Sequence, residues 1–255
     1  MPDETAPEND AAHANIGIVC ALAIELGAFL ERCERVKKYK GGDFVFRGGR
    51  YDDVRIAVVE TGLGFARARR ATQAMLDAHT PQWVVSAGFS GALLPEMKVG
   101  QIVMANSIVD THGHELKVDM KMPADPEHGL HVGRLVNTDE IVQTIAEKKR
   151  LAEETGAIAV DMESLAVAQI CQERGIRFLA VRVISDDLSA DLPDEVRTVI
   201  GTSGSARLGA ALGAVWKRPG SVKEMWHLRE TAMKAAERLA SFLDGVVKQL
   251  HAADH

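Results

Sequence analysis

Ala159-Val160-Asp161-Met162-Glu163-Ser164 reads as a short apolar strand that turns directly into a helix. Further along, the almost continuously apolar run Phe178–Ile184 ends in Ser185-Asp186-Asp187 and reads as a second strand with a polar end. Open α/β sheets bind ligands at the carboxyl ends of their strands. We therefore expect Glu163 and Asp186 to be delivered to one ligand site.

The same alternation of strands and helices extends outward along the chain, which favours a mainly parallel sheet covered by helices. Expected strands cover about 15–21, 43–48, 53–60, 82–87, 100–109, 131–136, 156–160 and 177–184, and expected helices cover 64–78, 140–154 and 164–174. Residues 111–130 are expected to form a long surface loop that is either functional or disordered. Residues 1–13 are expected to be a disordered tail. Residues 14–255 are expected to form one domain, which ends in a helical extension over about 202–250 with one long amphipathic helix from Ser221 to Leu250.

Composition excludes several partners. Thirty basic residues against 36 acidic ones give a formal net charge of −6, which provides no basic surface for nucleic acid or anionic membrane. The apolar stretch 16–30 is too short for a membrane span, and its acidic leader is unlike a signal peptide. Three cysteines without CxxC spacing are typical of a reduced cytoplasmic protein. A small molecule is the expected ligand.

Each acidic candidate has a structural and a catalytic interpretation. Asp186 is either a helix N-cap or a general acid whose carboxyl is partly desolvated at a pocket mouth. Glu163 is either an acid that favours a helix start or a receptor for the vicinal hydroxyls of a ribose. Glu25, at the turn into the first helix, is either an exposed helix acid or a base that polarises water. Carboxylates placed in this way suit cleavage of a glycosidic bond.

Other motifs carry weaker signals. The glycine turns Thr61-Gly62-Leu63-Gly64 and Ser86-Ala87-Gly88-Phe89-Ser90-Gly91 permit close approach of the backbone to a ligand. They match neither a dinucleotide-binding turn nor a Walker A loop. His112-Gly113-His114-Glu115 lacks the further ligands that a metal shell needs, so no metal is expected.

With these segments in this order, the chain resembles the nucleoside phosphorylase and nucleosidase superfamily, and within it the 5′-methylthioadenosine/S-adenosylhomocysteine nucleosidases. The resemblance covers roughly residues 15–110 and 155–190 and is carried best by Val160-Asp-Met-Glu-Ser164 and Val181-Arg-Val-Ile-Ser-Asp186. It implies a three-layer α/β/α fold with a mixed, mostly parallel, twisted central sheet. It also implies a homo-oligomer, often a dimer.

The resemblance further implies hydrolysis of the N-glycosidic bond of a 5′-modified adenosine, with release of adenine. Asp186 would protonate the purine N7, and Glu25 would position the attacking water. Glu163 would hold the ribose hydroxyls, with Met162 packed beneath the sugar. No metal or organic cofactor is then required. The residues that would support this arrangement are Arg182 and Ser185.

Departures from the family pattern concern the substrate pocket. Phe89 stands where the family has a serine near the catalytic acid, and Ser90, just before Gly91, is expected either to replace that serine or to leave its contact unmade. The family's purine-stacking phenylalanine corresponds roughly to Ile141, with Val142 beside it. The segment after strand 100–109 does not match the family's pocket for the 5′ substituent.

Three alternatives therefore stay open. A phosphate-dependent nucleoside phosphorylase would need cationic donors that the matching turn lacks. The long C-terminal extension is similar to the hopanoid-associated branch of the superfamily, which acts on adenosyl compounds with a large apolar 5′ group. A non-catalytic nucleoside-binding protein would keep the fold and lose turnover.

Overall fold

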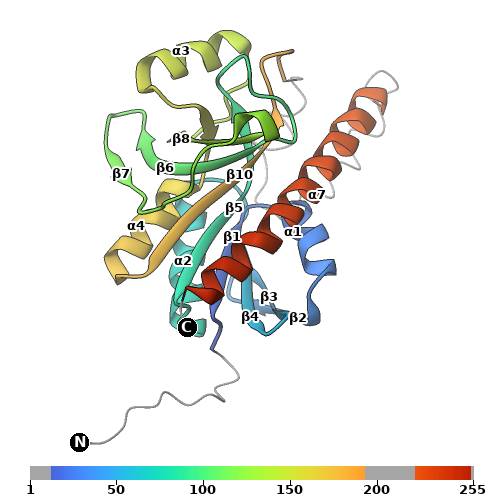
Figure 1. Cartoon of the computed structure of the whole chain (residues 1–255), viewed down its shortest axis with the longest axis vertical. Helices are drawn as coiled ribbons and strands as arrows, with labels where there is room; N and C mark the ends of the chain where they lie inside the picture. The colour runs from blue at the N-terminus through green and yellow to red at the C-terminus, as the bar shows by residue number, and fades with distance from the viewer. Residues whose placement is uncertain (1–12, 193–221, 254–255) are drawn as a thin grey trace, which may run out of the picture.

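The computed structural model describes residues 13–192 and 222–253, so the expected tail over 1–12, residues 193–221 and the start of the last helix at Ser221 lie outside the described residues. The elements are drawn in Figure 1. In chain order they are β1 (Ile16–Cys20), α1 (Ala23–Glu31), β2 (Glu34–Gly41), β3 (Phe44–Tyr51), β4 (Val54–Glu60), α2 (Phe65–His79), β5 (Trp83–Ala92), β6 (Ile102–Asp110), β7 (Glu115–Lys117), η1 (Pro126–His128), β8 (Leu130–Asn137), α3 (Ile145–Thr155), β9 (Ala159–Asp161), α4 (Ser164–Arg174), β10 (Arg177–Asp186) and α7 (Val222–Ala252).

All described strands belong to one mixed sheet in the order β10-β6-β8-β9-β5-β1-β4-β3-β2, with β7 paired to β6. An additional pairing of β10 with β5 closes strands β5, β10, β6, β8 and β9 into a ring. The expected α/β fold with a mixed sheet is confirmed. Parallel pairing does not dominate, however, because β2, β3 and β4 form antiparallel hairpins and β9, β7 and β10 each have an antiparallel neighbour.

The expected strands and helices are all present; most have shifted ends, whereas α4 has the expected ones. Strand β5 extends five residues beyond the expected 82–87, and α3 begins at Ile145 rather than at 140 because Thr144 caps it through the backbone N–H of Glu147. Two strands, β2 and β7, were not expected. All but the last residue of β2 are exposed, so it shows no alternation of apolar and polar side chains. The long loop expected over 111–130 contains both β7 and η1.

The helices contact one another in two pairs, α1 with α7 and α2 with α4, and both pairs also contact strands. Figure 1 shows α1 and α7 side by side. From Ala235 onward, α7 buries Ala235, Leu239, Ala240, Leu243 and Val247 completely, in the same apolar cluster as residues of β1, β5 and β10. Among residues 13–192 and 222–253, no helix combines the length and apolarity needed to cross a membrane.

Candidate active site

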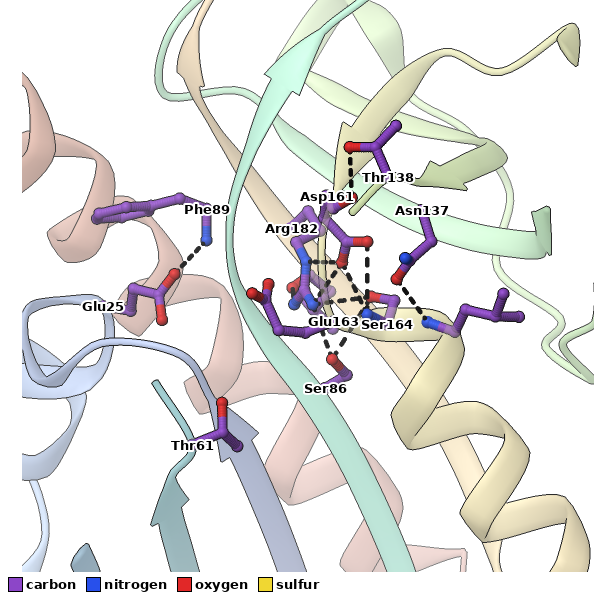
Figure 2. A network of polar contacts seen from close by, with 12 residues as sticks. Glu25, Thr61, Ser86, Phe89, Asn137, Thr138, Asp161, Glu163, Ser164 and Arg182 are labelled. Atoms are coloured by element: carbon purple, nitrogen blue, oxygen red, sulfur yellow. Dashed lines mark hydrogen bonds and ion pairs between the residues drawn. The ribbon is translucent and has the colours of Figure 1, made fainter. Parts of the chain in front are cut away.

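Arg182 of β10 stands at the centre of a buried polar network that Figure 2 shows. Its Nε donates to Asp161 Oδ2 at 2.7 Å, and its Nη2 donates to the hydroxyls of Ser86 and Ser164, each at 2.8 Å. The Arg182 and Asp161 side chains are only 3% and 1% exposed. A buried charge of either sign needs such partners. The network therefore joins the turn between β9 and α4 to strands β5 and β10.

Glu163 follows this ion pair and is buried at the N-cap of α4. Its Oε1 accepts a hydrogen bond of 2.7 Å from the backbone N–H of Gly64, the N-cap of α2. Burial and the nearby carboxylates of Asp161 and Glu25 raise the pKa of Glu163 to about 8, although the Gly64 bond opposes the shift. The glycine turn of residues 61–64 is thus in contact with the turn of residues 161–163 between β9 and α4.

Glu25 lies in the first turn of α1 and is 4% exposed, so the interpretation as an exposed helix acid is wrong. Its carboxylate accepts backbone hydrogen bonds from Leu22 at 2.8 Å and from Phe89 at 2.9 Å. Gly88 makes this approach possible, because a Cβ there would lie 2.7 Å from Glu25 Oε1. Burial raises the pKa of Glu25 against the effect of these hydrogen bonds. Figure 2 shows the contact with Phe89.

Asp186 lies at the end of β10, beyond a bulge. Ile184 pairs with Ser90 and Asp186 pairs with Gly91, so Ser185 is the extra residue. A bulge of this kind redirects the side chain that follows it. The Asp186 side chain is 21% exposed, and its Oδ1 accepts from Ser185 Oγ at 2.8 Å. A Cβ on Gly91 would lie 3.0 Å from Asp186 Oδ2, so glycine leaves room for the carboxylate.

Sequence reasoning missed Lys148 of α3, whose side chain is completely buried. Its Nζ donates to Asp186 Oδ2 at 2.5 Å and lies 3.3 Å from the carbonyl oxygen of Asp187. In the sequence, Lys148 is one of many charges in an amphipathic helix. The available signal was its spacing of three from Leu151, the other buried residue of α3.

Of the two alternatives for Ser90, the structure agrees with the one in which the contact is left unmade. Ser90 Oγ is buried and has no hydrogen-bond partner among the described residues, and Asp186 is contacted instead by the hydroxyl of Ser185. Phe89 is half-buried against the main apolar cluster, and its backbone N–H contacts Glu25. Ser185 Oγ also lies 3.3 Å from the carbonyl oxygen of Ser90.

The residues expected near the purine and the sugar are half-buried. Val142 packs against the cluster that contains Val160, and a Cβ on Gly91 would also meet Val160. Ile141 lies in the segment between β8 and α3, and Met162 lies between Asp161 and Glu163.

His114, one of the two histidines in the His112–Glu115 motif, has its Nδ1 2.8 Å from Asp110. Across the described part of the chain, no three His, Cys, Asp or Glu residues are grouped so that they could hold a metal ion.

Strand β5 connects the candidate residues. Its Gly88 and Phe89 contact Glu25, and its Gly91 lies beside Asp186. Glu163 is close enough to Glu25 for the charge of Glu25 to contribute to the raised pKa of Glu163. Glu25 and Glu163 are thus buried carboxyl groups with raised pKa values. Asp186 is more exposed and is paired with Lys148.

Comparison with known proteins gives the class. The model of the phosphorylase superfamily matches residues 15–215. This chain therefore belongs to the phosphorylase superfamily. A 5′-methylthioadenosine/S-adenosylhomocysteine nucleosidase of Mycobacterium bovis is 24% identical over 241 residues, which cover 76% of this chain and 94% of the relative.

Solved structures with the same fold include two proteins of Helicobacter pylori. One is a 5′-methylthioadenosine/S-adenosylhomocysteine nucleosidase with butyl-thio-DADMe-Immucillin-A; it has a TM-score of 0.69 and 22% identity, and the match covers 93% of this chain and 99% of the other. The other is a futalosine hydrolase with a TM-score of 0.64 and 22% identity, matched over 90% of this chain and 97% of its own.

Proposed function

We propose that the protein is an N-glycosyl hydrolase that cleaves a 5′-modified adenosine of the methylthioadenosine or adenosylhomocysteine type and releases adenine. The observation that carries the proposal is the convergence of Glu25, Glu163 and Asp186 on strand β5 and its neighbours in a chain of the phosphorylase superfamily. The nucleosidases among its relatives support the reaction class.

In the proposed mechanism, Asp186 delivers a proton to N7 of the purine while the bond from N9 to C1′ breaks. Glu163 accepts hydrogen bonds from the 2′ and 3′ hydroxyls of the ribose, with Met162 beneath the sugar. Glu25 orients the attacking water and takes its proton. Such a reaction passes through an oxocarbenium-like state, with the acid and the water on opposite sides of the sugar. Arg182 keeps the turn that bears Glu163 in place.

Water is favoured over phosphate as the nucleophile because of the charges around Glu25. The buried carboxyl group of Glu163 lies within electrostatic reach of Asp161 and of Glu25. The nearby Arg182 is engaged with Asp161, Ser86 and Ser164. A phosphate dianion near Glu25 and Glu163 would be repelled by their carboxylates. The phosphorylase alternative is therefore the weaker one.

Product analysis tests the proposal. The protein is incubated with methylthioadenosine or adenosylhomocysteine, with and without phosphate, and the purine and sugar products are separated. We expect adenine and the free sugar at rates independent of phosphate. A sugar 1-phosphate formed only with phosphate would establish the phosphorylase alternative. Binding without turnover would establish the non-catalytic one.

The 5′ substituent is tested in the same assay. Adenosyl compounds with a large apolar 5′ group test the hopanoid-associated alternative, and futalosine is included because a structural neighbour is a futalosine hydrolase. We expect the highest kcat/KM with the methylthio or homocysteinyl compounds. A preference of tenfold or more, about 1.4 kcal/mol, for another member of the panel would reassign the substrate.

Three further proposals follow from the resemblance. We infer that the helix pairs α1–α7 and α2–α4 form separate layers on the two faces of the sheet, and their mutual contacts support this. We also propose a homodimer and a cytoplasmic location. Light scattering of the purified protein tests the homodimer, and fractionation of the source cells tests the cytoplasmic location.

A further inference from the structure

Lys148 occupies a position that its chemistry makes unexpected. Its side chain is completely buried on the inner face of α3, which otherwise buries only Leu151. Burial of an ammonium costs free energy that a single carboxylate partner offsets at best, whereas an apolar side chain of similar volume would pack there without that cost. Packing of α3 alone therefore gives no reason for a lysine.

The hydrogen bonds of Asp186 bear on how its carboxyl group can act as an acid. Oδ2 accepts from Lys148 Nζ and Oδ1 accepts from Ser185 Oγ, so both carboxylate oxygens act as acceptors. An ionised carboxylate has only acceptor sites and no proton to donate. A carboxylate that only accepts hydrogen bonds must first receive a proton, from solvent or from a group in contact with it, before it can protonate a leaving purine.

Lys148 is the neighbour that can supply it. Among the described hydrogen bonds of the Lys148–Asp186 pair, the other groups are uncharged: the Ser185 hydroxyl and the Asp187 carbonyl. A serine hydroxyl is far too weak an acid for this purpose. The Lys148 ammonium, whose Nζ lies 2.5 Å from Asp186 Oδ2, carries an exchangeable proton. Lys148 itself is fully buried and Asp186 is 21% exposed, so the substrate meets the carboxyl group and not the lysine.

We propose that Lys148 supplies the proton that Asp186 passes to the leaving base, an inference that rests on the proposed function. The Lys148 ammonium gives a proton to the Asp186 carboxylate, which gives a proton to N7 of the purine as the pair of electrons in the C1′–N9 bond moves to the ring. Water forms the new bond to C1′ and loses its proton to Glu25. After the products leave, Glu25 releases this proton to solvent, and the neutral Lys148 amine regains a proton through the partly exposed Asp186 carboxyl group. Lys148 acts through Asp186 and is a positioning residue.

The experiment compares leaving groups that do and do not need a proton. Adenine leaves methylthioadenosine with protonation, whereas 4-nitrophenolate leaves the 4-nitrophenyl glycoside of 5-methylthioribose as a stable anion. The variants are Lys148→Met, which removes the charge, and Lys148→Arg, which keeps the charge but cannot release a proton. Lys149→Met is the matched control, because Lys149 is the next residue of α3 and is exposed.

For Lys148→Met and Lys148→Arg, we expect kcat on methylthioadenosine to fall by about 10²- to 10³-fold, and kcat on the 4-nitrophenyl glycoside to stay within about threefold of the unmodified enzyme. The Lys149→Met control should match the unmodified enzyme on both. Unfolding temperatures establish that the variants are folded, and Lys148→Arg retains a cation for Asp186 if Lys148→Met does not fold.

Three results would overturn the inference: equal losses on the two substrates, no loss on methylthioadenosine, or full activity of Lys148→Arg with methylthioadenosine. Equal losses on the two substrates would show that Lys148 has a structural role. Full activity of Lys148→Arg would show that its role is purely electrostatic. If the unmodified protein releases no adenine from methylthioadenosine or adenosylhomocysteine, the proposed function fails and the inference with it. Adenine release that is insensitive to both Lys148 variants refutes the inference alone.

Discussion

Replacement of Asp186 by asparagine separates the catalytic and structural contributions of its carboxylate. The amide cannot pass a proton to the base, so we expect turnover of methylthioadenosine to fall by about 10²- to 10⁴-fold. The change also leaves the buried Lys148 ammonium opposite a neutral group, and we expect a loss of about 2–4 kcal/mol in the free energy of unfolding. Steady-state kinetics and urea unfolding measure the two effects.

The double variant Asp186→Asn/Lys148→Met is the control for stability. It removes both charges, so the free energy of unfolding should recover most of the loss seen in Asp186→Asn while activity stays low. Substantial turnover by a folded Asp186→Asn protein would exclude Asp186 as the acid. If the Asp186→Asn protein is as stable as the unmodified protein, the buried ion pair does not contribute to the free energy of unfolding as expected.

Glu163 gives a prediction for the dependence of stability on pH. Its pKa is 4.5 in an ordinary environment and is raised to about 8 in the fold, chiefly by burial. Between these values the unfolded chain has lost the proton and the folded protein retains it, so the free energy of unfolding falls as pH rises through this window. Glu163→Gln should reduce the fall by roughly 2–4 kcal/mol between about pH 5 and pH 8.

Urea unfolding at a series of pH values compares Glu163→Gln with Glu153→Gln, an exposed glutamate of α3 that serves as the matched control. The control should keep the pH dependence of the unmodified protein. A residual slope in Glu163→Gln is expected because burial also raises the pKa of Glu25. An unchanged slope in Glu163→Gln would show that Glu163 ionises normally in the fold.

At the scale of elements, the close approach of α1 to β5 depends on Gly88. Gly88→Ala would place a Cβ 2.7 Å from Glu25 Oε1 and 3.0 Å from its Cδ, so the carboxylate must leave the Phe89 and Leu22 N–H groups. We expect a loss of about 1–3 kcal/mol in the free energy of unfolding and a fall of at least roughly tenfold in kcat.

Gly27→Ala is the matched control, because Gly27 also lies in α1 and a Cβ there meets nothing within 4 Å. This substitution should raise the free energy of unfolding by about 0.5–1 kcal/mol, since alanine is the better helix former. Thermal unfolding and adenine release are measured for both. A Gly88→Ala protein with normal kcat would mean that the position of Glu25 is not important for the reaction.

The elements that the sequence predicted are those with a strong periodic pattern. Strands β5 and β10 are runs of buried apolar residues, and α4 was predicted with its observed ends, 164–174. Strand β2 carries charged or polar side chains at most positions and is held by its pairing with β3, a contact that no local pattern encodes. The closure of β5 and β10 into a ring likewise depends on pairing between distant strands.

The candidate site was predictable where it rests on local motifs. Glu163 and Asp186 stand at the ends of strands that the apolar runs already mark, and Arg182 lies within the second of these strands. Lys148 was not predictable in the same way, because its burial depends on a carboxylate 38 positions later in the chain. The burial of Glu25 similarly depends on Gly88 and on the backbone of Phe89 in another strand.

At the scale of the whole molecule, helix α7 is expected to belong to the same cooperative unit as the candidate site. Leu243 is completely buried in the cluster that also contains residues of β1, β5 and β10. Arg32, the C-cap of α1, forms ion pairs with Asp244 and Glu237 of α7. We therefore propose that the described chain unfolds as one domain. Leu243→Ala should lower the free energy of unfolding by about 2–5 kcal/mol.

Met233→Ala is the matched control, because Met233 lies in the same helix and is 55% exposed; its effect should stay within about 0.5 kcal/mol. The measurement follows helix content and adenine release against temperature. In one cooperative domain, Leu243→Ala shifts both signals together to lower temperature, since the cavity weakens the core on which β5 and β10 present Glu25 and Asp186. If α7 were an independent appendage, the helix signal alone would shift and the temperature at which adenine release is lost would stay unchanged.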